Sequence, residues 1–250
     1  MDGETILETR ELVKAFQGFV AVNGVSLRVA RGSIHALIGP NGAGKTTVFN
    51  LLTRFLPATR GSILFRGEDI TRARPAEIAR RGLVRSFQVS AVFPDLTALE
   101  NVRVALQRGL GTSFHFWRPE RSLSVLDARA RELLAAVGLE GQEQVTTVEL
   151  PYGRKRALEI ATTLALEPEV MLLDEPTQGM GHEDVGRVVG LIRQVAAGRT
   201  VVLVEHNLSV VRDLADRVTV LARGSVLAEG TYDEVSRDPA VLEAYIGASP

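Results

Sequence analysis

A glycine-rich loop between an apolar run and a helical pattern constrains the fold of this 250-residue chain more than any other feature. The run IHALIG, residues 34–39, is apolar and strand-length, and it leads into GPNGAGKT, residues 39–46. The helical pattern TTVFNLLTRFL follows. Glycines let backbone N–H groups turn inward around a phosphate, and a helix that starts directly after them points its positive end at the same anion. This order predicts a phosphate site at the carboxyl end of a buried strand, with Lys45 on the β- and γ-phosphates and the Thr46 hydroxyl on Mg²⁺.

Two other apolar runs also end in polar side chains. VMLLDE, residues 170–175, ends in Asp174 and Glu175, and TVVLVEH, residues 200–206, ends in His206. In a parallel sheet, ligands bind beyond the carboxyl ends of the strands. We therefore expect Asp174 to hold Mg²⁺, directly or through water, and Glu175 to orient or deprotonate the attacking water. The imidazole of His206 is expected to contact the γ-phosphate and that water.

The patterns along the chain predict an α/β fold with two additions. From residue 150 onward, strand and helix patterns alternate, which indicates a parallel sheet covered on both faces. Residues 5–38 read as short antiparallel strands, with Asn23-Gly24 as a turn. From about 75 to 136 the character is helical. Of the other histidines, His35 is expected in the core or on a sheet face, and His115 and His182 in loops.

Composition excludes several classes of function. The formal net charge is −1, so no global field holds a nucleic acid or an anionic membrane, and any anion site must be local. The chain has no cysteine, which excludes a disulfide framework and thiolate metal sites. No run approaches the roughly 18 apolar residues of a membrane span. Work at a membrane therefore requires docking onto another protein there.

The stretch ELPYGRKRALEIA, residues 149–161, predicts a helix that begins near Pro151. Arg154, Lys155 and Arg156 follow at once, although the first turn of a helix carries a partial positive charge that disfavours cations. Either these side chains are solvated, or an anion belongs at this helix start.

Five separated motifs together resemble the nucleotide-binding subunit of an ABC transporter, over nearly the whole chain. They are the loop 39–47, RSFQ with Gln88, LPYGRKR, VMLLDEPT and His206. The resemblance implies a P-loop NTPase fold of the ABC ATPase type: a mostly parallel sheet with helices on both sides, an N-terminal antiparallel β layer and a helical subdomain insert. It implies one domain over 1–250, with the helical subdomain at about 89–165 and a C-terminal tail at about 230–250.

The resemblance also implies ATP and Mg²⁺ as cofactors and gives roles to individual residues. Glu175 is the expected catalytic carboxylate and His206 the switch histidine. Gln88 is expected to ligate Mg²⁺ and to couple the site to a membrane partner, and Phe16 to stack on adenine. The nucleotide is expected to contact Gly39, Pro40, Asn41, Gly42, Ala43, Gly44, Lys45, Thr46 and Thr47, and from a second subunit Gly153 and Arg154.

In that family two subunits meet head to tail, and the signature helix of each caps the ATP held by the other. The family's usual signature is Leu-Ser-Gly-Gly-Gln, whereas this chain has Pro151 for the serine, Tyr152 for the first glycine and Arg154 for the glutamine. Gly181 stands where an Asp is usual. These departures leave the chain's own phosphate loop and strand-end residues unchanged. Because the chain has one loop and one signature, it needs a second copy or a homologous partner.

A narrower resemblance is to the ATPases of branched-chain amino-acid importers, carried by the loop region, FPDLTALENV, LPYGRKRALEIA and the tail VLEAYIG. It implies ATP hydrolysis coupled to transport of branched-chain or other amino acids. The implied partners are permease subunits and, indirectly, a substrate-binding protein, with the chain peripheral on the cytoplasmic face of the inner membrane. The aromatic run of Phe114, Phe116 and Trp117 is a candidate docking surface, or else local packing of an insert loop.

Four alternatives stay open. The chain is also similar to ATPases of urea and short-amide importers and of lipopolysaccharide-type exporters. A soluble, non-transport ABC ATPase that moves nucleic acid or ribosomes is a third. Proteins of that kind usually carry long coiled coils or two ATPase halves in one chain, and neither pattern is present; the balanced charge also argues against it. A non-hydrolysing nucleotide-binding regulator is the fourth, against which Glu175 and His206 argue.

Overall fold

The computed structural model describes residues 3–86, 92–108 and 124–246. Their contacts divide the chain into two compact units. The first unit contains residues 1–85, 169–177 and 196–250, and the second contains 86–168 and 178–195. The first segment of the second unit overlaps the helical subdomain expected at about 89–165. Gln88, His115, Phe114, Phe116 and Trp117 lie outside the described residues.

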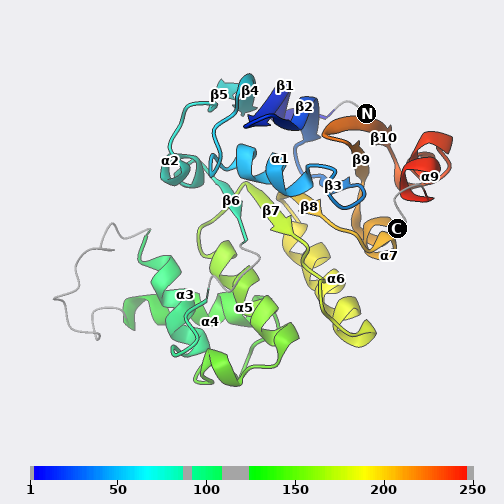
Figure 1. Cartoon of the computed structure of the whole chain (residues 1–250). Helices are drawn as coiled ribbons and strands as arrows, with labels where there is room; N and C mark the ends of the chain where they lie inside the picture. Colours follow the sequence, from blue (N-terminus) through cyan, green and yellow to red (C-terminus); the bar gives the residue numbers. More distant parts are fainter. Residues whose placement is uncertain (1–2, 87–91, 109–123, 247–250) are drawn as a thin grey trace. The chain divides into compact units, whose positions relative to one another are not determined.

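The first unit contains an antiparallel sheet in the order β2-β1-β4-β5 (Figure 1). Its strands are β1 (Thr5–Phe16), β2 (Phe19–Ala30), β4 (Arg60–Phe65) and β5 (Glu68–Asp69). The antiparallel layer is thus confirmed, but the turn predicted at Asn23-Gly24 is wrong.

The β1–β2 hairpin turns at Gln17-Gly18 instead, and Asn23-Gly24 lies inside β2. Leu12 pairs with Val25 and Lys14 with Val22, so two residues of β2 stand opposite one of β1. Gly24 takes a φ of 71° at this point. The Asn-Gly pair therefore forms a β-bulge, for which the same left-handed conformation of glycine is needed as in a turn.

A second sheet in this unit has the order β10-β9-β3-β8-β7-β6. Its strands are β3 (Ile34–Ile38), β6 (Leu83–Arg85), β7 (Val170–Asp174), β8 (Thr200–Val204), β9 (Arg217–Ala222) and β10 (Ser225–Gly230). All neighbours pair in parallel except β10, which is antiparallel to β9. Strands β3, β7 and β8 are buried along their whole length, as strands with both faces covered must be. The mostly parallel sheet is confirmed.

Helix α1 (Lys45–Leu52) contributes side chains to the core that the two sheets share. Val48, Phe49, Leu51 and Leu52 belong to one buried cluster with residues of β1, β2, β4, β3, β7 and β8. This core fixes the start of α1, and hence the phosphate loop before it, against the sheet. The other helices of the unit are α2 (Pro75–Arg80), α7 (Leu208–Leu214), α8 (Tyr232–Val235) and α9 (Pro239–Ile246).

His35 occupies the core position expected for it. It lies in β3 and is 1% exposed, and its Nε2 is 2.8 Å from the Thr219 hydroxyl. Burial lowers the pKa of His35 to about 4. The imidazole is therefore neutral at physiological pH and serves packing rather than catalysis.

The second unit is helical. It contains α3 (Ala98–Leu106), α4 (Asp127–Ala136), a 3₁₀ turn (Thr147–Glu149), α5 (Tyr152–Leu164) and residues 182–195 of α6 (His182–Ala196). Thr97 and Glu100 cap α3 reciprocally, as the Thr-x-x-Glu spacing dictates. His182 begins α6, so its predicted loop position is wrong: Glu183 and Asp184 in the first turn suit the positive end of a helix. Among the described residues, no helix is both long and apolar enough to cross a membrane.

Candidate nucleotide site

The loop from Gly39 to Gly44 joins β3 to α1 and lies close to the backbones of β9 and β2, which belong to different sheets. A side chain at Gly39, whose φ is 148°, would place its Cβ 2.1 Å from the Leu221 carbonyl oxygen of β9. One at Gly44, whose φ is 99°, would come within 2.6 Å of the Ala21 carbonyl oxygen of β2. Both positions therefore require glycine, which lets the loop backbone follow this curved path close to its neighbours.

Lys45 folds back over this loop. Its side chain donates to the carbonyl oxygens of Gly39 at 2.7 Å and Pro40 at 3.0 Å, and the residue is 8% exposed. Burial lowers the pKa of Lys45, while Glu175 and Asp174 act to raise it. The ammonium thus lies within electrostatic reach of both predicted strand-end carboxylates. Of the other loop residues, Asn41, Gly42 and Thr46 are exposed and Ala43 is buried.

Asp174 and Glu175 leave the end of β7 in different ways. Asp174 is the last residue of the strand and is 1% exposed. Glu175 has a φ of 44°, a left-handed conformation that costs energy for a residue with a Cβ. Its N–H still donates to the Val204 carbonyl of β8 at 2.9 Å. The backbone therefore turns sharply after Asp174. The expected metal ligand, Asp174, is the last residue of the strand, and the expected base, Glu175, is the first residue of the turn.

Glu205 is a residue of this site that sequence reasoning missed. It follows β8 and is fully buried, and its carboxylate accepts four hydrogen bonds. One oxygen accepts from the Thr177 N–H at 3.1 Å and the Thr177 hydroxyl at 2.6 Å. The other accepts from the N–H groups of His206 at 3.1 Å and Asn207 at 3.2 Å. Glu205 therefore ties the segment after Glu175 to the segment that carries His206. An acid directly after an apolar strand was the available signal.

We expect Glu205→Gln to lower kcat for ATP hydrolysis on the order of tenfold or more, with KM for ATP unchanged. An amide has one acceptor oxygen, so its NH₂ would face two N–H or O–H donors, and the two segments would separate. Steady-state hydrolysis over a range of ATP concentrations measures both constants. Glu229→Gln, which alters a partly exposed ion pair with Arg217 on β9 and β10, is the matched control. A rise in KM without a fall in kcat would contradict the positioning role.

The other predicted residues of the first unit are accessible. The His206 side chain is 55% exposed, with Nδ1 4.0 Å from a Glu205 oxygen. Phe16 ends β1 and is 45% exposed, and the Lys14 ammonium lies 5.0 Å from its ring centroid. An exposed aromatic ring is available for stacking on a base, as the adenine role requires.

The donor set fits a magnesium ion that arrives with a nucleotide. Within the described parts of the chain, no group of three or more His, Cys, Asp or Glu side chains is arranged to hold a metal. Mg²⁺ is usually bound through one or two carboxylates together with phosphate oxygens and waters. The Asp174 carboxylate and the Thr46 hydroxyl are oxygen donors of this kind, and the remaining positions would fall to phosphates and water.

The C-terminal helix α9 lies beside the start of the phosphate loop. Burial raises the pKa of Tyr245, on α9, to about 12, while the backbone of Gly39 acts in the opposite direction. Helices α8 and α9 both contact β10, so the tail after β10 packs on the first unit.

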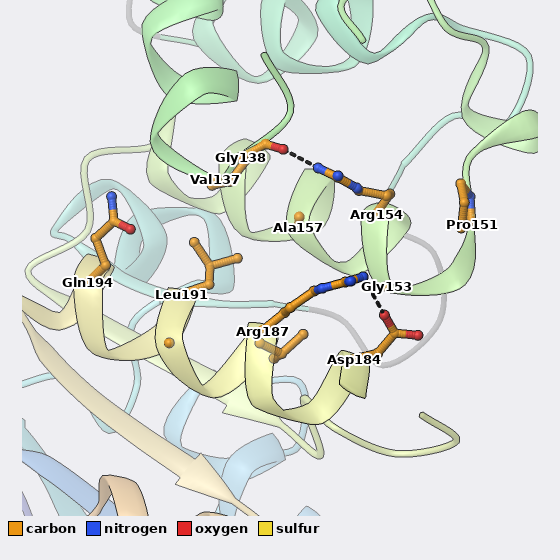
Figure 2. A pocket seen from close by; sticks show the side chains of 12 residues that line it. Val137, Gly138, Pro151, Gly153, Arg154, Ala157, Asp184, Arg187, Leu191 and Gln194 are labelled. Atoms are coloured by element: carbon orange, nitrogen blue, oxygen red, sulfur yellow. Dashed lines mark hydrogen bonds and ion pairs between the residues drawn. The ribbon is translucent and has the colours of Figure 1, made fainter. Parts of the chain in front are cut away.

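The stretch LPYGRKR, which is predicted to contact the nucleotide of another subunit, lies in the helical second unit of this chain. Pro151 is the N-cap of α5, with no side-chain cap bond. Figure 2 shows Gly153 and Arg154 on the wall of a hollow of about 520 Å³ between α5 and α6. A Cβ on Gly153 would lie 3.2 Å from an Asp184 carboxylate oxygen of α6. The side chain of Tyr152 is exposed, and its hydroxyl donates a hydrogen bond to the Gln178 carbonyl oxygen at 3.0 Å.

All three cations at this helix start have partners inside the second unit. The guanidinium of Arg154 donates to the Gly138 carbonyl (Figure 2). Lys155 donates to the Val148 carbonyl at 3.0 Å, and Arg156 pairs with Glu159 at 2.5 Å. Carbonyl and carboxylate oxygens thus offset the unfavourable helix-end charge. The contact of Gly153 and Arg154 with a nucleotide on another subunit stays a prediction.

Two family models match the chain. The model described as "ABC transporter" matches residues 22–178, and that described as "Branched-chain amino acid ATP-binding cassette transporter" matches residues 225–249. The first spans the loop, the signature stretch and both strand-end carboxylates of β7, and the second covers β10 and the C-terminal helices.

Similar proteins agree with these models. The chain is 38% identical to the high-affinity branched-chain amino acid transport ATP-binding protein BraF of Pseudomonas aeruginosa, covering 97% of this chain and 98% of that protein. It is 36% identical to the corresponding protein LivG of Escherichia coli K12, covering 98% of each. The solved ADP conformation of MJ1267, an ATP-binding cassette of an ABC transporter, is 32% identical, with a TM-score of 0.87 over 98% of this chain and 99% of that one. The predicted family and fold are confirmed: the chain belongs to the ATP-binding cassettes of the ABC transporter family.

Proposed function

We propose that this chain is the ATP-binding and ATP-hydrolysing subunit of an importer of branched-chain amino acids. The observation that carries the substrate class is the match of residues 225–249 to the branched-chain amino acid transporter model. That segment lies outside the general cassette match, so it separates this branch from other cassettes. The names of BraF and LivG, which are similar over nearly the whole chain, support the same class.

The residues described above divide the reaction among themselves. The backbone of loop 39–47 and the Lys45 ammonium bind and orient the ATP phosphates. Asp174 and Thr46 would hold Mg²⁺, which neutralises charge on the β- and γ-phosphate oxygens when bound. Glu175 accepts a proton from the attacking water, and His206 contacts the γ-phosphate and that water. The roles of Phe16 on adenine and of Gln88 on Mg²⁺ remain part of this proposal.

A second cassette and a membrane partner complete the proposed assembly. MJ0796, a bacterial ABC transporter cassette that was solved as a dimer, is 25% identical to this chain with a TM-score of 0.76. We infer that this chain likewise pairs with a second ATPase subunit, identical or homologous, which supplies Gly153 and Arg154 to the site. Permease subunits would hold the pair at the cytoplasmic face of the inner membrane, and a substrate-binding protein would act with them. In this assembly the two compact units work as one cassette domain.

Uptake of labelled leucine tests the substrate class. Cells of the source organism that lack this chain are expected to lose high-affinity leucine uptake. The parental chain restores it, whereas Lys45→Ala, which removes the phosphate-binding ammonium, does not. Labelled urea is the matched control substrate, and its uptake should be the same in all strains. If the strain that lacks this chain keeps normal leucine uptake but loses urea uptake, the chain belongs to a urea or amide importer. If neither uptake changes, the soluble ATPase and exporter alternatives apply instead.

A further inference from the structure

Arg85 and Asp174 form a buried ion pair at the end of the parallel sheet. Arg85 ends β6, Asp174 ends β7, and the two strands are paired in parallel, with Arg85 opposite Leu172. A guanidinium nitrogen lies 2.5 Å from a carboxylate oxygen. The Arg85 side chain is 9% exposed and that of Asp174 is 0% exposed. Water therefore contributes little to the solvation of either charge, and the pairing offsets part of the cost of burying both.

Arg85 is also fastened to the helix that follows the phosphate loop. A second guanidinium nitrogen donates to the Asn50 side-chain oxygen of α1 at 2.6 Å. The guanidinium lies 5.7 Å from the ring centroid of Phe49, also on α1. A planar guanidinium makes such contacts in several directions at once, which a lysine ammonium on a flexible stem does not. Arg85 thus holds the Asp174 carboxylate in a fixed relation to α1.

Two cationic side chains act on the strand-end carboxylates of the site. Arg85 pairs with Asp174, and the Lys45 ammonium is under the influence of Glu175 and Asp174. Two positive side chains thus stand against two negative ones, and the nearby Glu205 carboxylate keeps its negative charge while its oxygens are occupied by four hydrogen-bond donors. A free divalent cation meets a carboxylate ligand of which one oxygen already has a guanidinium nitrogen at 2.5 Å. A cation that arrives on ATP brings the negative charge of the phosphates with it and overcomes this competition.

We propose that Arg85 positions the Asp174 carboxylate and competes with divalent cations for it. Arg85 keeps the carboxylate at the end of β7 in place and prevents the site from binding a divalent cation that carries no nucleotide. The inference rests on the proposed function, because it takes Asp174 as a ligand of the metal that accompanies ATP.

Binding of Mn²⁺ to the purified chain tests the proposal, with free Mn²⁺ measured by electron paramagnetic resonance. The parental chain is expected to bind Mn²⁺ weakly without nucleotide and well with ATP. Arg85→Met removes the competing charge and should tighten nucleotide-free Mn²⁺ binding about tenfold or more. Adding Asp174→Asn to that variant should return the affinity to the parental level. Arg217→Met, which removes a half-exposed cation paired with Glu229, is the matched control and should change nothing.

A second neutral variant and thermal melting guard against a folding defect. Arg85→Gln keeps a hydrogen-bond donor near Asp174 and should also tighten nucleotide-free Mn²⁺ binding. Arg85→Met should melt at a lower temperature than the parent, and Arg85→Met with Asp174→Asn should recover most of that loss, because no buried charge is then left alone. Mn²⁺ without nucleotide should raise the melting temperature of Arg85→Met more than that of the parent.

The possible outcomes separate this inference from the proposed function. Equal nucleotide-free Mn²⁺ affinity in the parent and in both neutral Arg85 variants, with normal binding of Mn²⁺ together with ATP, overturns the competitor role and leaves the proposed function standing. Failure of the parental chain to bind Mn²⁺ with ATP overturns both, because Asp174 would then not be a metal ligand.

Discussion

The Glu175→Gln variant is expected to lose steady-state ATP hydrolysis by roughly 10²–10⁴-fold and to bind ATP as the parent does. Glu175 follows β7 with a φ of 44°, and its N–H is anchored to Val204 of β8. Glutamine preserves the length of the side chain and its hydrogen-bonding oxygen, so the strained backbone and the anchor stay as they are. It cannot accept a proton from water at neutral pH, so the chemical step fails while phosphate binding by Lys45 and the loop continues.

This variant should also accumulate in an ATP-bound dimer. If hydrolysis reopens the pair, blocking it leaves ATP between the two subunits, and light scattering should show a dimer with ATP and a monomer with ADP. Glu140→Gln, an exposed acid in the second unit, is the matched control and should hydrolyse ATP normally. Steady-state hydrolysis at the parental rate by Glu175→Gln would remove Glu175 from the role of base, and a monomer with ATP would contradict the proposed dimer.

The sequence predicted the fold and the positions of the strand-end residues well because buried parallel strands have a strong signal. VMLLD and TVVLV are continuous apolar runs, which in the structure are buried throughout, and the polar residues after them necessarily lie at one edge of the sheet. The phosphate loop is equally recognisable, because Gly39 and Gly44 have backbone conformations and close contacts that exclude other residues.

Pairing between distant residues was not predictable in the same way. Asn23-Gly24 has the composition of a turn, but register between β1 and β2 decides that it is a bulge. Arg85 looks like an exposed charge in a short strand, and only the neighbouring β7 places Asp174 beside it. Glu205 was not singled out beside His206. Two of its four donors belong to Thr177, which is 28 residues earlier in the chain, and the other two are the N–H groups of the two residues that follow it. Such residues are defined by tertiary contacts, which no local pattern carries.

The partners of the three cations of LPYGRKR were likewise not visible in the sequence. In sequence they are an unfavourable start to a helix that invites an external anion. In the structure Arg154, Lys155 and Arg156 each have an oxygen partner within their own unit. In the proposed dimer, the contact with the other subunit's nucleotide would then fall mainly to the backbone at the start of α5, with Gly153 at its centre and Arg154 beside it. Gly153 is therefore the better residue to substitute in a test of the contact with a second subunit.

The Gly153→Asp variant is expected to bind ATP like the parent and to hydrolyse it on the order of a hundredfold more slowly. In the proposed dimer the start of α5 faces the γ-phosphate held by the other subunit, so a carboxylate there repels the phosphate. Gly153 also lies against Asp184, where a Cβ would be 3.2 Å from a carboxylate oxygen. A new acid thus meets a like charge inside its own unit as well, and the design must separate the two effects.

Two further variants make that separation. Gly153→Asp with Asp184→Asn removes the internal repulsion but keeps the new charge towards the other subunit, and it should stay inactive. Gly153→Ala adds only a methyl group against a flexible carboxylate and should retain most of the activity. Recovery of hydrolysis in the double variant would show that the loss arose within one subunit, which would reduce LPYGRKR to a helix start.

Mixing two inactive variants tests the shared site directly. Gly153→Asp keeps an intact phosphate loop, and Lys45→Ala keeps an intact signature stretch. If each site combines the loop of one subunit with the signature of the other, a mixed dimer contains one complete site, and ATP hydrolysis should reappear on mixing. If loop and signature had to belong to the same chain, no mixed dimer would contain a complete site and the mixture would stay inactive. Hydrolysis on mixing, measured against each variant alone, therefore decides whether Gly153 acts on its own nucleotide or on that of its partner.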